Sequence, residues 1–247
     1  MTRLDQALVD RGLCESREKA KRAIMAGQVR LNGQLARKPS ETVAEPARLT
    51  LDAPEKFVSR GGYKLEHALL HFRADVRGQT AIDLGASTGG FTDCLLQHGA
   101  AKVYAVDVGQ GQLAWKLRHD PRVVVMEKTN ARQLTPARFP QPFAPANWIV
   151  IDCSFISLRR ILPPAVALLA ASGKIIALIK PQFEAGKAEA DKGAGVIRDP
   201  EIHQRVLREL AEFVAAQPGL LWRGFTESPL LGPAGNREFL ALIEKTG

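Results

Sequence analysis

The chain has 247 residues, of which 45% are hydrophobic and 24% charged, and its formal net charge at pH 7 is +8. This composition excludes an intrinsically disordered chain and leaves room for one large and one small globular domain. The basic balance favours a polyanionic partner, because clustered Lys and Arg residues displace counterions from phosphates.

Cysteine spacing and the absence of long apolar runs narrow the class of protein further. Cys14, Cys94 and Cys153 form no C-x-x-C pair, which excludes the usual zinc spacing and a disulfide framework, so we expect no metal site. No apolar run reaches the roughly 18 residues that a membrane span needs, and residues 1–5 show no signal core. We therefore expect a cytoplasmic protein without membrane insertion.

Residues 1–52 predict a small α+β domain. Apolar residues at helical spacing indicate a helix over 3–11 with Thr2 as its N-cap, and Ser16 is a good N-cap for a second helix that ends at Met25. Alternating apolar residues around an Asn-Gly pair predict a β-hairpin over 29–35. A further short strand is expected over 48–51.

The second helix of this domain is basic, and the hairpin adds to its charge. The candidate RNA-binding residues are Arg17, Lys19, Lys21, Arg22 and Arg30. Because no aromatic residue precedes Phe57, the domain cannot stack unpaired bases and would bind phosphates and shape. The alternative is a merely solvated charged helix face. The order helix, helix, Asn-Gly hairpin resembles the small RNA-binding module named after ribosomal protein S4.

A polar, proline-containing stretch predicts a linker over 53–60, and residues 61–247 form the second predicted domain. Strands and helices alternate there, which indicates an α/β fold with a mostly parallel, seven-stranded sheet covered on both faces. The expected strands are 80–84, 102–107, 122–126, 147–152, 174–179, 220–228 and 238–244, the last two as a hairpin. The expected helices begin near Tyr63 and lie near 91–98, 111–118, 158–170 and 201–216.

A glycine-rich strand–turn–helix over 81–91 lies at the start of this domain. It lacks the P-loop lysine and misses the G-x-G-x-x-G spacing. A second apolar run ends about twenty residues later at Asp107, whose carboxylate can accept hydrogen bonds from ribose hydroxyls. Together they resemble the S-adenosylmethionine site of Rossmann-like methyltransferases. The cofactor residues that this implies are Asp83, Gly85, Ala86, Ser87, Thr88, Gly89, Gly90, Asp107, Asn130 and Asp152, although Asn130 could equally be a plain loop residue.

Charged residues end two further predicted strands. These are Asp152 and Lys180, and Pro181 favours extended geometry at Lys180. Because ligands of open parallel sheets gather at the carboxyl ends of the strands, we expect the two side chains to meet. With Lys64 and Glu238 they resemble, in order and context, the Lys-Asp-Lys-Glu tetrad of FtsJ-like ribose 2′-O-methyltransferases.

With its basic N-terminal domain included, the whole chain resembles the TlyA or haemolysin A family. That resemblance implies S-adenosylmethionine-dependent 2′-O-methylation of ribosomal RNA, with ribosomal subunits as partners and Lys64, Asp152, Lys180 and Glu238 as catalytic residues. Lys180 would take the proton of the ribose hydroxyl. The sequence leaves open whether Lys180 is a true base or a hydrogen-bond guide, because a nearby ammonium opposes its charge while two carboxylates favour it.

Several alternatives remain open. Asp152-Cys153-Ser154-Phe155 stands where base N-methyltransferases carry an Asp-Pro-Pro-Tyr motif, and Cys153 suggests covalent cytosine methylation. Outside enzymes, the chain could be a non-catalytic RNA-binding or ribosome-assembly factor, or a lytic protein. Residues 184–199, rich in Gly, Lys and Ala, could form a lid, an RNA-contacting loop or a disordered segment. The sequence does not determine the oligomeric state.

Overall fold

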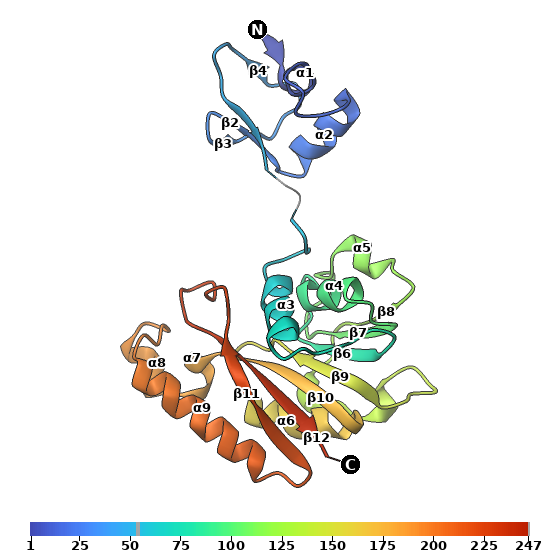
Figure 1. The fold of residues 1–247 in the computed structure, drawn as a ribbon, viewed down its shortest axis with the longest axis vertical. Coiled ribbons are helices and arrows are strands. Elements are labelled where there is room, and N and C mark those ends of the chain that lie inside the picture. The colour runs from blue at the N-terminus through green and yellow to red at the C-terminus, as the bar shows by residue number, and fades with distance from the viewer. Residues whose placement is uncertain (53–54, 247) are drawn as a thin grey trace. The chain divides into compact units, whose positions relative to one another are not determined.

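The computed structural model describes residues 1–52 and 55–246, which fall into two compact units, 1–56 and 57–247 (Figure 1). Part of the predicted linker, residues 53–54, lies outside the described residues. Its C-terminal part belongs to the large unit: Phe57 is 2% exposed, and a Cβ on Gly62 would lie 2.3 Å from the Phe57 ring. The predicted linker 53–60 therefore extends too far toward its C-terminal end, because the buried side chain of Phe57 already belongs to the large unit.

The small unit contains both predicted helices and the hairpin. Its elements are β1 (Thr2–Arg3), α1 (Leu4–Asp10), α2 (Arg17–Met25), β2 (Val29–Leu31), β3 (Gln34–Leu35), β4 (Thr42–Val43) and β5 (Leu49–Leu51). The strands form an antiparallel sheet in the order β3-β2-β5 and a separate antiparallel pair, β1 with β4. Ser16 caps α2 as predicted, accepting a hydrogen bond from the Lys19 N–H.

One prediction for this unit is wrong. Thr2 does not cap α1, because it pairs with Val43 in a two-stranded ladder, and the N-cap position falls to Arg3, which makes no side-chain cap. Strands β1 and β4 have two residues each. Such short strands carry no periodic pattern, so the sequence did not predict them.

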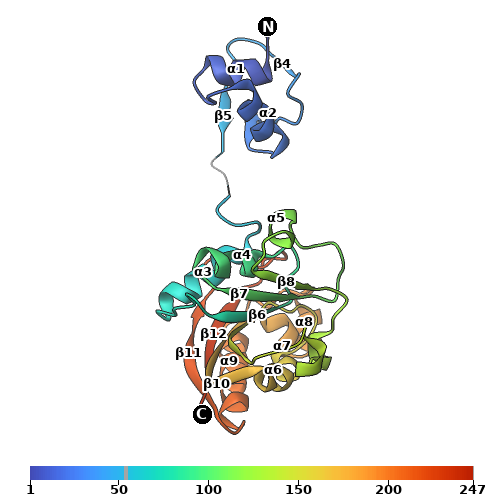
Figure 2. The same cartoon turned by 90° about the vertical axis from the view of Figure 1, so that its right-hand side faces the viewer.

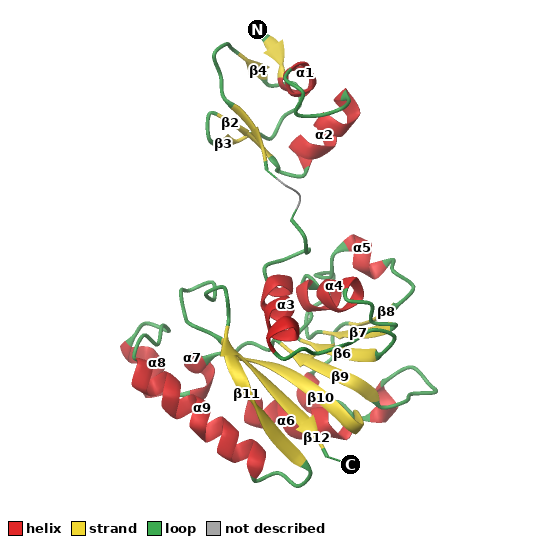
Figure 3. Ribbon diagram, viewed as in Figure 1, coloured by secondary structure: helices red, strands yellow, loops and turns green. Residues whose placement is uncertain are grey.

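The large unit is an alternating α/β domain (Figure 3). Its elements are α3 (Gly61–His71), β6 (Thr80–Leu84), α4 (Gly90–Gln97), β7 (Lys102–Val106), α5 (Trp115–Arg118), β8 (Val123–Met126), η1 (Ala131–Gln133), η2 (Pro136–Arg138), β9 (Ala146–Ile151), α6 (Leu158–Ala167), β10 (Leu169–Ile179), α7 (Pro181–Glu184), α8 (Lys187–Lys192), α9 (Pro200–Ala215), β11 (Leu220–Glu227) and β12 (Phe239–Lys245). The seven strands lie in the order β11-β12-β10-β9-β6-β7-β8. Only β12 runs against its neighbours, so the predicted fold class is confirmed.

Alternating side chains of the central strands bury both faces of this sheet. In β9, Ile149 and Ile151 pack into one core with α6 and α9, while Trp148 and Val150 pack into the other with α3 and α4. Figure 2 shows α3, α4 and α5 on one side of the sheet and α6 and α9 on the other. The period of two along a strand produces this division, since successive residues point to opposite faces.

Some elements differ in length from the expectation. Helix α5 is one turn long rather than 111–118, because Gly111 has a positive φ of 71° and Ala114 is extended, so the helix begins only at Trp115. Residues 184–199 contain the short helix α8 and the buried Ile197, while most of the other described residues between 191 and 199 are exposed. Among the described residues, no helix is both long and apolar enough to cross a membrane.

Candidate active site

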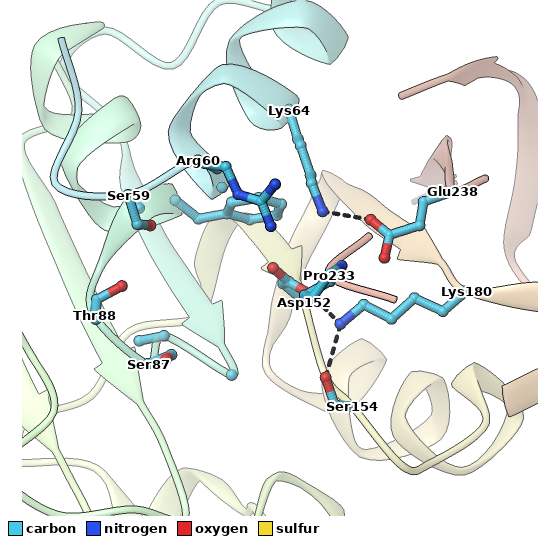
Figure 4. A pocket seen from close by; sticks show the side chains of 15 residues that line it. Ser59, Arg60, Lys64, Ser87, Thr88, Asp152, Ser154, Lys180, Pro233 and Glu238 are labelled. Atoms are coloured by element: carbon cyan, nitrogen blue, oxygen red, sulfur yellow. Dashed lines mark hydrogen bonds and ion pairs between the residues drawn. The ribbon is translucent and has the colours of Figure 1, made fainter. Parts of the chain in front are cut away.

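A pocket of about 300 Å³ lies where β6, β9 and β10 end, at the carboxyl edge of the sheet (Figure 4). Segments 59–61, 85–88 and 90–91 line it. The other lining residues are Lys64, Asp152, Ser154, Lys180, Pro233 and Glu238. All four residues of the predicted catalytic tetrad therefore face one cavity, although Lys64 comes from α3, Asp152 and Lys180 directly follow β9 and β10, and Glu238 directly precedes β12.

Gly85 sets the floor of this cavity. Its φ is +87°, a conformation that other L residues rarely adopt, and a Cβ at this position would lie 2.5 Å from the carbonyl oxygen of Asp152. Only glycine lets the turn after β6 approach the backbone after β9 so closely. The glycine loop and the Asp152 loop are thus held together without intervening side chains.

The tetrad consists of two ion pairs. The Lys64 ammonium donates a hydrogen bond to Oε2 of Glu238, and both side chains are almost fully buried. The Lys180 Nζ lies 2.6 Å from Oδ1 of Asp152 and donates to Oγ of Ser154 at 2.8 Å. Each lysine is therefore matched by its own carboxylate, and Lys180 is held in place from two sides.

This pairing changes the expected effect of Lys64 on the charge of Lys180. Lys64 was expected to oppose the charge on Lys180, but Glu238 offsets the Lys64 ammonium directly. The group closest to the Lys180 ammonium is instead the Asp152 carboxylate. What the geometry establishes is the orientation of Lys180, with Asp152 and Ser154 fixing the direction of its amine.

A second pocket of about 260 Å³ adjoins the first and shares Gly85, Asp152 and Ser154 with it. Asp107 and Asn130, the two residues predicted for the nucleoside half of a cofactor site, both line this second pocket. Asp107 accepts hydrogen bonds from the backbone N–H groups of Ser87 at 2.8 Å and Gly109 at 2.7 Å, so its carboxylate orders the glycine loop.

Asn130 also has a structural role. Its Oδ1 accepts a hydrogen bond from the Arg132 N–H at 3.0 Å and so caps η1. This is the loop role left open by the sequence, and it is compatible with a place in the pocket lining.

Two predicted cofactor residues, Asp83 and Gly89, do not line either pocket. Gly89 is covered by Leu117, whose Cδ1 would lie 2.3 Å from a Cβ there. Asp83 is fully buried; its Oδ2 accepts from Thr92 Oγ1 at 2.6 Å, and its Oδ1 has no hydrogen-bond partner among the described residues. Both residues support the loop from behind.

The carboxylates around this loop suit a cationic ligand. Burial, together with the neighbouring Asp152 and Asp107 carboxylates, raises the pKa of Asp83 to about 7. The Asp107 and Asp152 carboxylates line the second pocket, where they attract a positively charged group. The pockets therefore fit a ligand that carries positive charge, as the sulfonium and ammonium groups of S-adenosylmethionine do.

The raised pKa of Asp83 predicts how the stability of the ligand-free protein depends on pH. The folded state keeps this proton up to about pH 7, while an unfolded Asp loses it near pH 4, so the folded state binds more protons in between. Stability due to this group therefore falls as pH rises from 4 to 7, by up to about 4 kcal/mol. Urea unfolding of wild type and Asp83→Asn at several pH values should show the difference shrinking with acidity; a difference that is independent of pH would contradict this assignment.

Cys153 is poorly suited to covalent chemistry. Burial, reinforced by the Asp152 carboxylate, raises the pKa of its thiol to about 12, and Sγ faces the Leu84 carbonyl oxygen at 3.5 Å. Because the thiolate is the nucleophilic form, this cysteine stays unreactive near neutral pH. The covalent cytosine mechanism is therefore disfavoured.

Ser154 and Asn236 were not predicted as site residues. Buried Asn236 accepts from the Ile197 N–H and donates to the Gly195 carbonyl, both at 2.9 Å, which fastens segment 195–197 to the loop that carries Glu238. Both residues stand beside predicted ones in the sequence. Their partners, however, are distant in the chain, and no local pattern signals them.

The candidate RNA-binding residues of the small unit are mostly paired. Lys19 pairs with Glu15, Lys21 with Glu18 at 2.7 Å, Arg30 with Asp52 at 2.8 Å, and Arg17 with Asp5 at 3.1 Å. The first three are exposed pairs, which contribute little and can exchange partners. The Arg17 pair is different, because the Asp5 side chain is fully buried and Arg3 also binds it, which keeps the pKa of Asp5 well below its usual range.

Comparisons with known proteins agree with both units. The family model described as FtsJ-like methyltransferase matches residues 57–245, and that of the S4 domain matches residues 2–46. The 16S/23S rRNA (cytidine-2′-O)-methyltransferase TlyA of Mycobacterium tuberculosis is 46% identical over 96% of this chain and 87% of its own length. Hemolysin A of Brachyspira hyodysenteriae is 41% identical over 97% of this chain and 98% of its own length.

A solved structure supports the same conclusion. The structure of a suspected hemolysin from Streptococcus thermophilus has a TM-score of 0.75 and 46% identity, covering 99% of this chain and 88% of that one. The resemblance drawn from the glycine loop, the tetrad and the N-terminal helices is therefore confirmed.

Proposed function

The chain belongs to the FtsJ-like methyltransferase family, and we propose that it methylates the 2′-hydroxyl of a ribose in ribosomal RNA. The observation that carries this proposal is the meeting of Lys64, Asp152, Lys180 and Glu238 in one pocket, next to the glycine loop. The TlyA relative, named for the same chemistry, supports it. The enzyme acts on ribosomal subunits in the cytoplasm.

The methyl donor is S-adenosylmethionine, which supplies an electrophilic methyl group on a cationic sulfur. The glycine loop, residues 85–88 with Gly90, would hold its amino-acid end in the first pocket. Asp107 and Asn130 would hold its nucleoside in the second. Asp83 supports the loop from behind through its hydrogen bond from Thr92.

Lys180 is the residue that acts on the acceptor. A ribose hydroxyl is a weak nucleophile, and it loses its proton as its oxygen forms the new bond to the methyl carbon and the bond between that carbon and the donor's sulfur breaks. Lys180 in its neutral amine form takes that proton and becomes the ammonium, and Asp152 and Ser154 hold its nitrogen at the required position. The buried Lys64–Glu238 pair forms the opposite wall and keeps the site shaped for the hydroxyl.

An apolar pocket of about 340 Å³ next to Lys180 and Glu238 is the proposed place of the acceptor nucleoside. Its rim carries Phe155, which is 90% exposed, has a positive φ of 62° and lies 5.1 Å from Phe183 between ring centroids. A bulky residue held in this conformation and left in solvent indicates a functional role. A base displaced from its RNA stack would pack on this ring.

The small unit would dock on ribosomal RNA, and Arg22 offers the sharpest test. Its side chain is exposed and, within the described part of the chain, pairs with no carboxylate, whereas Arg17 anchors buried Asp5 and its loss would disturb the fold. We expect Arg22→Gln to weaken RNA affinity about three- to tenfold and to flatten its salt dependence. Cofactor affinity should stay unchanged, and Lys19→Gln, which removes a residue paired with Glu15, should have the smaller effect. Equal RNA binding by wild type and Arg22→Gln in filter assays would contradict the docking role.

The proposed function is tested by incubating the pure protein with methyl-labelled S-adenosylmethionine and separated ribosomal subunits. We expect label in ribosomal RNA from at least one subunit, and none in a parallel incubation with transfer RNA. Cofactor binding without any transfer would instead indicate a non-catalytic RNA-binding factor.

A further inference from the structure

A hollow of about 330 Å³ lies beside the proposed acceptor pocket. It is lined by Arg132, Phe155, Ile156, Ser157, Arg160 and Phe183. Phe155 and Phe183 also line the acceptor pocket, so the two rings form a wall between the two spaces. Neither the family match nor the tetrad gives this hollow a role.

Two arginines give the hollow its charge. Arg132 belongs to η1 and Arg160 to the first turn of α6, and both are exposed. Among the described residues, neither guanidinium has a hydrogen-bond or ion-pair partner, whereas the neighbouring Arg159 is bound to Glu209 at 3.0 Å. Guanidinium groups without a carboxylate in a concave surface are well suited to a phosphate, which they can bind through two N–H groups each.

The N-terminus of helix α6 does not compete for such an anion. The Leu158 N–H donates to the Glu184 carboxylate at 2.8 Å, Ser157 Oγ donates to it at 2.7 Å, and the Arg159 N–H donates to Ser157 Oγ at 3.2 Å. The helix N-terminus is therefore already capped by Ser157 together with Glu184. Any anion in the hollow would be held by the two arginines.

We propose that Arg132 and Arg160 bind the RNA phosphate that adjoins the acceptor nucleotide. The proposal rests on the proposed function, because it places the acceptor base on one side of the Phe155–Phe183 wall and its neighbouring phosphate on the other. The large unit would then bind the RNA by a contact of its own, separate from that of the basic helix α2 in the small unit. Because phosphate contacts fix register without reading sequence, this site would set the position of the ribose toward Lys180.

The test compares Arg132→Gln, Arg160→Gln and the double variant with Arg159→Gln, a matched loss of charge on the same helix. We expect each single variant to raise KM for ribosomal RNA about tenfold and to leave kcat at saturating RNA unchanged. In filter binding, the double variant should reduce the slope of log affinity against log salt by about 0.7, the value for one phosphate of a single strand. Arg159→Gln should behave as wild type.

Arg132 also lines the second pocket, so it could bind the cofactor instead of RNA. Measuring cofactor affinity by calorimetry distinguishes these two roles. A weaker affinity for S-adenosylmethionine in Arg132→Gln would assign that residue to the cofactor and overturn the proposal. Equal KM and equal salt slopes for the double variant and Arg159→Gln would overturn it as well. If the wild type transferred no methyl group, the proposed function would fail, and the salt slopes would still decide whether the arginines bind RNA.

Discussion

Replacing Lys180 with methionine is expected to lower kcat for methyl transfer by about 10³-fold, within the range of 10² to 10⁴ typical of a lost general base. In the proposed mechanism the Lys180 amine, held by Asp152 and Ser154, is the proton acceptor, so the variant loses that group while the pockets keep their shape. Lys180→Arg should lose nearly as much, because its guanidinium keeps the charge and does not release a proton near neutral pH. Single-turnover rates at saturating cofactor and RNA measure both variants.

The matched control is Lys174→Met. Lys174 lies on β10, the strand that ends just before Lys180, and its ammonium lies 5.7 Å from the centre of the Trp148 ring. This variant also removes one lysine charge and should keep wild-type kcat. If Lys180→Arg turned over nearly as fast as wild type, the residue would be an orienting cation rather than a base, and the proton-transfer role would be wrong.

Replacing Gly85 with alanine is expected to abolish measurable cofactor binding, with an increase in Kd of at least about 100-fold. A Cβ at this position would lie 2.5 Å from the Asp152 carbonyl oxygen, so the loop after β6 and the loop after β9 must separate. Both pockets share Gly85 and Asp152, and both would therefore be deformed. Overpacking combined with a positive φ should also lower the free energy of unfolding by about 2 to 4 kcal/mol.

The Gly78→Ala variant separates the two effects expected in Gly85→Ala, which are the close contact with Asp152 and the strain of an alanine at positive φ. Gly78 also has a positive φ, +68°, but no atom would lie within 4 Å of a new Cβ. This variant should lose only about 1 kcal/mol of stability and should bind cofactor normally in calorimetry. Normal cofactor affinity in Gly85→Ala would show that the contact with Asp152 does not shape the site.

Much of the fold could be predicted because its signals are local. The alternation of apolar runs with helical segments indicates a parallel sheet, and the turn after Asp83 requires glycine where β6 meets the loop of β9. The proximity of Asp152 and Lys180 could be predicted from the sequence because each directly follows a buried strand. Parallel strands present their carboxyl ends at one edge of the sheet.

The partners of these residues could not be predicted in the same way. Lys64 and Glu238 are 174 positions apart, and only the packing of α3 beside the start of β12 shows that each neutralises the other. Ser154 and Asn236 act through contacts across loops, which leave no periodic trace in the sequence. The buried Asp5 that holds Arg17 is also a tertiary contact, and it changes which arginine of the small unit is free to bind RNA.

The position of the transferred methyl group tests the central claim most directly. Ribosomal RNA labelled by the wild-type enzyme would be digested to nucleosides, and the labelled nucleoside would be identified by chromatography and mass spectrometry. We predict a 2′-O-methyl nucleoside, with the label on the sugar, and loss of that product in Lys180→Met. A label on the base would contradict the role assigned to the tetrad.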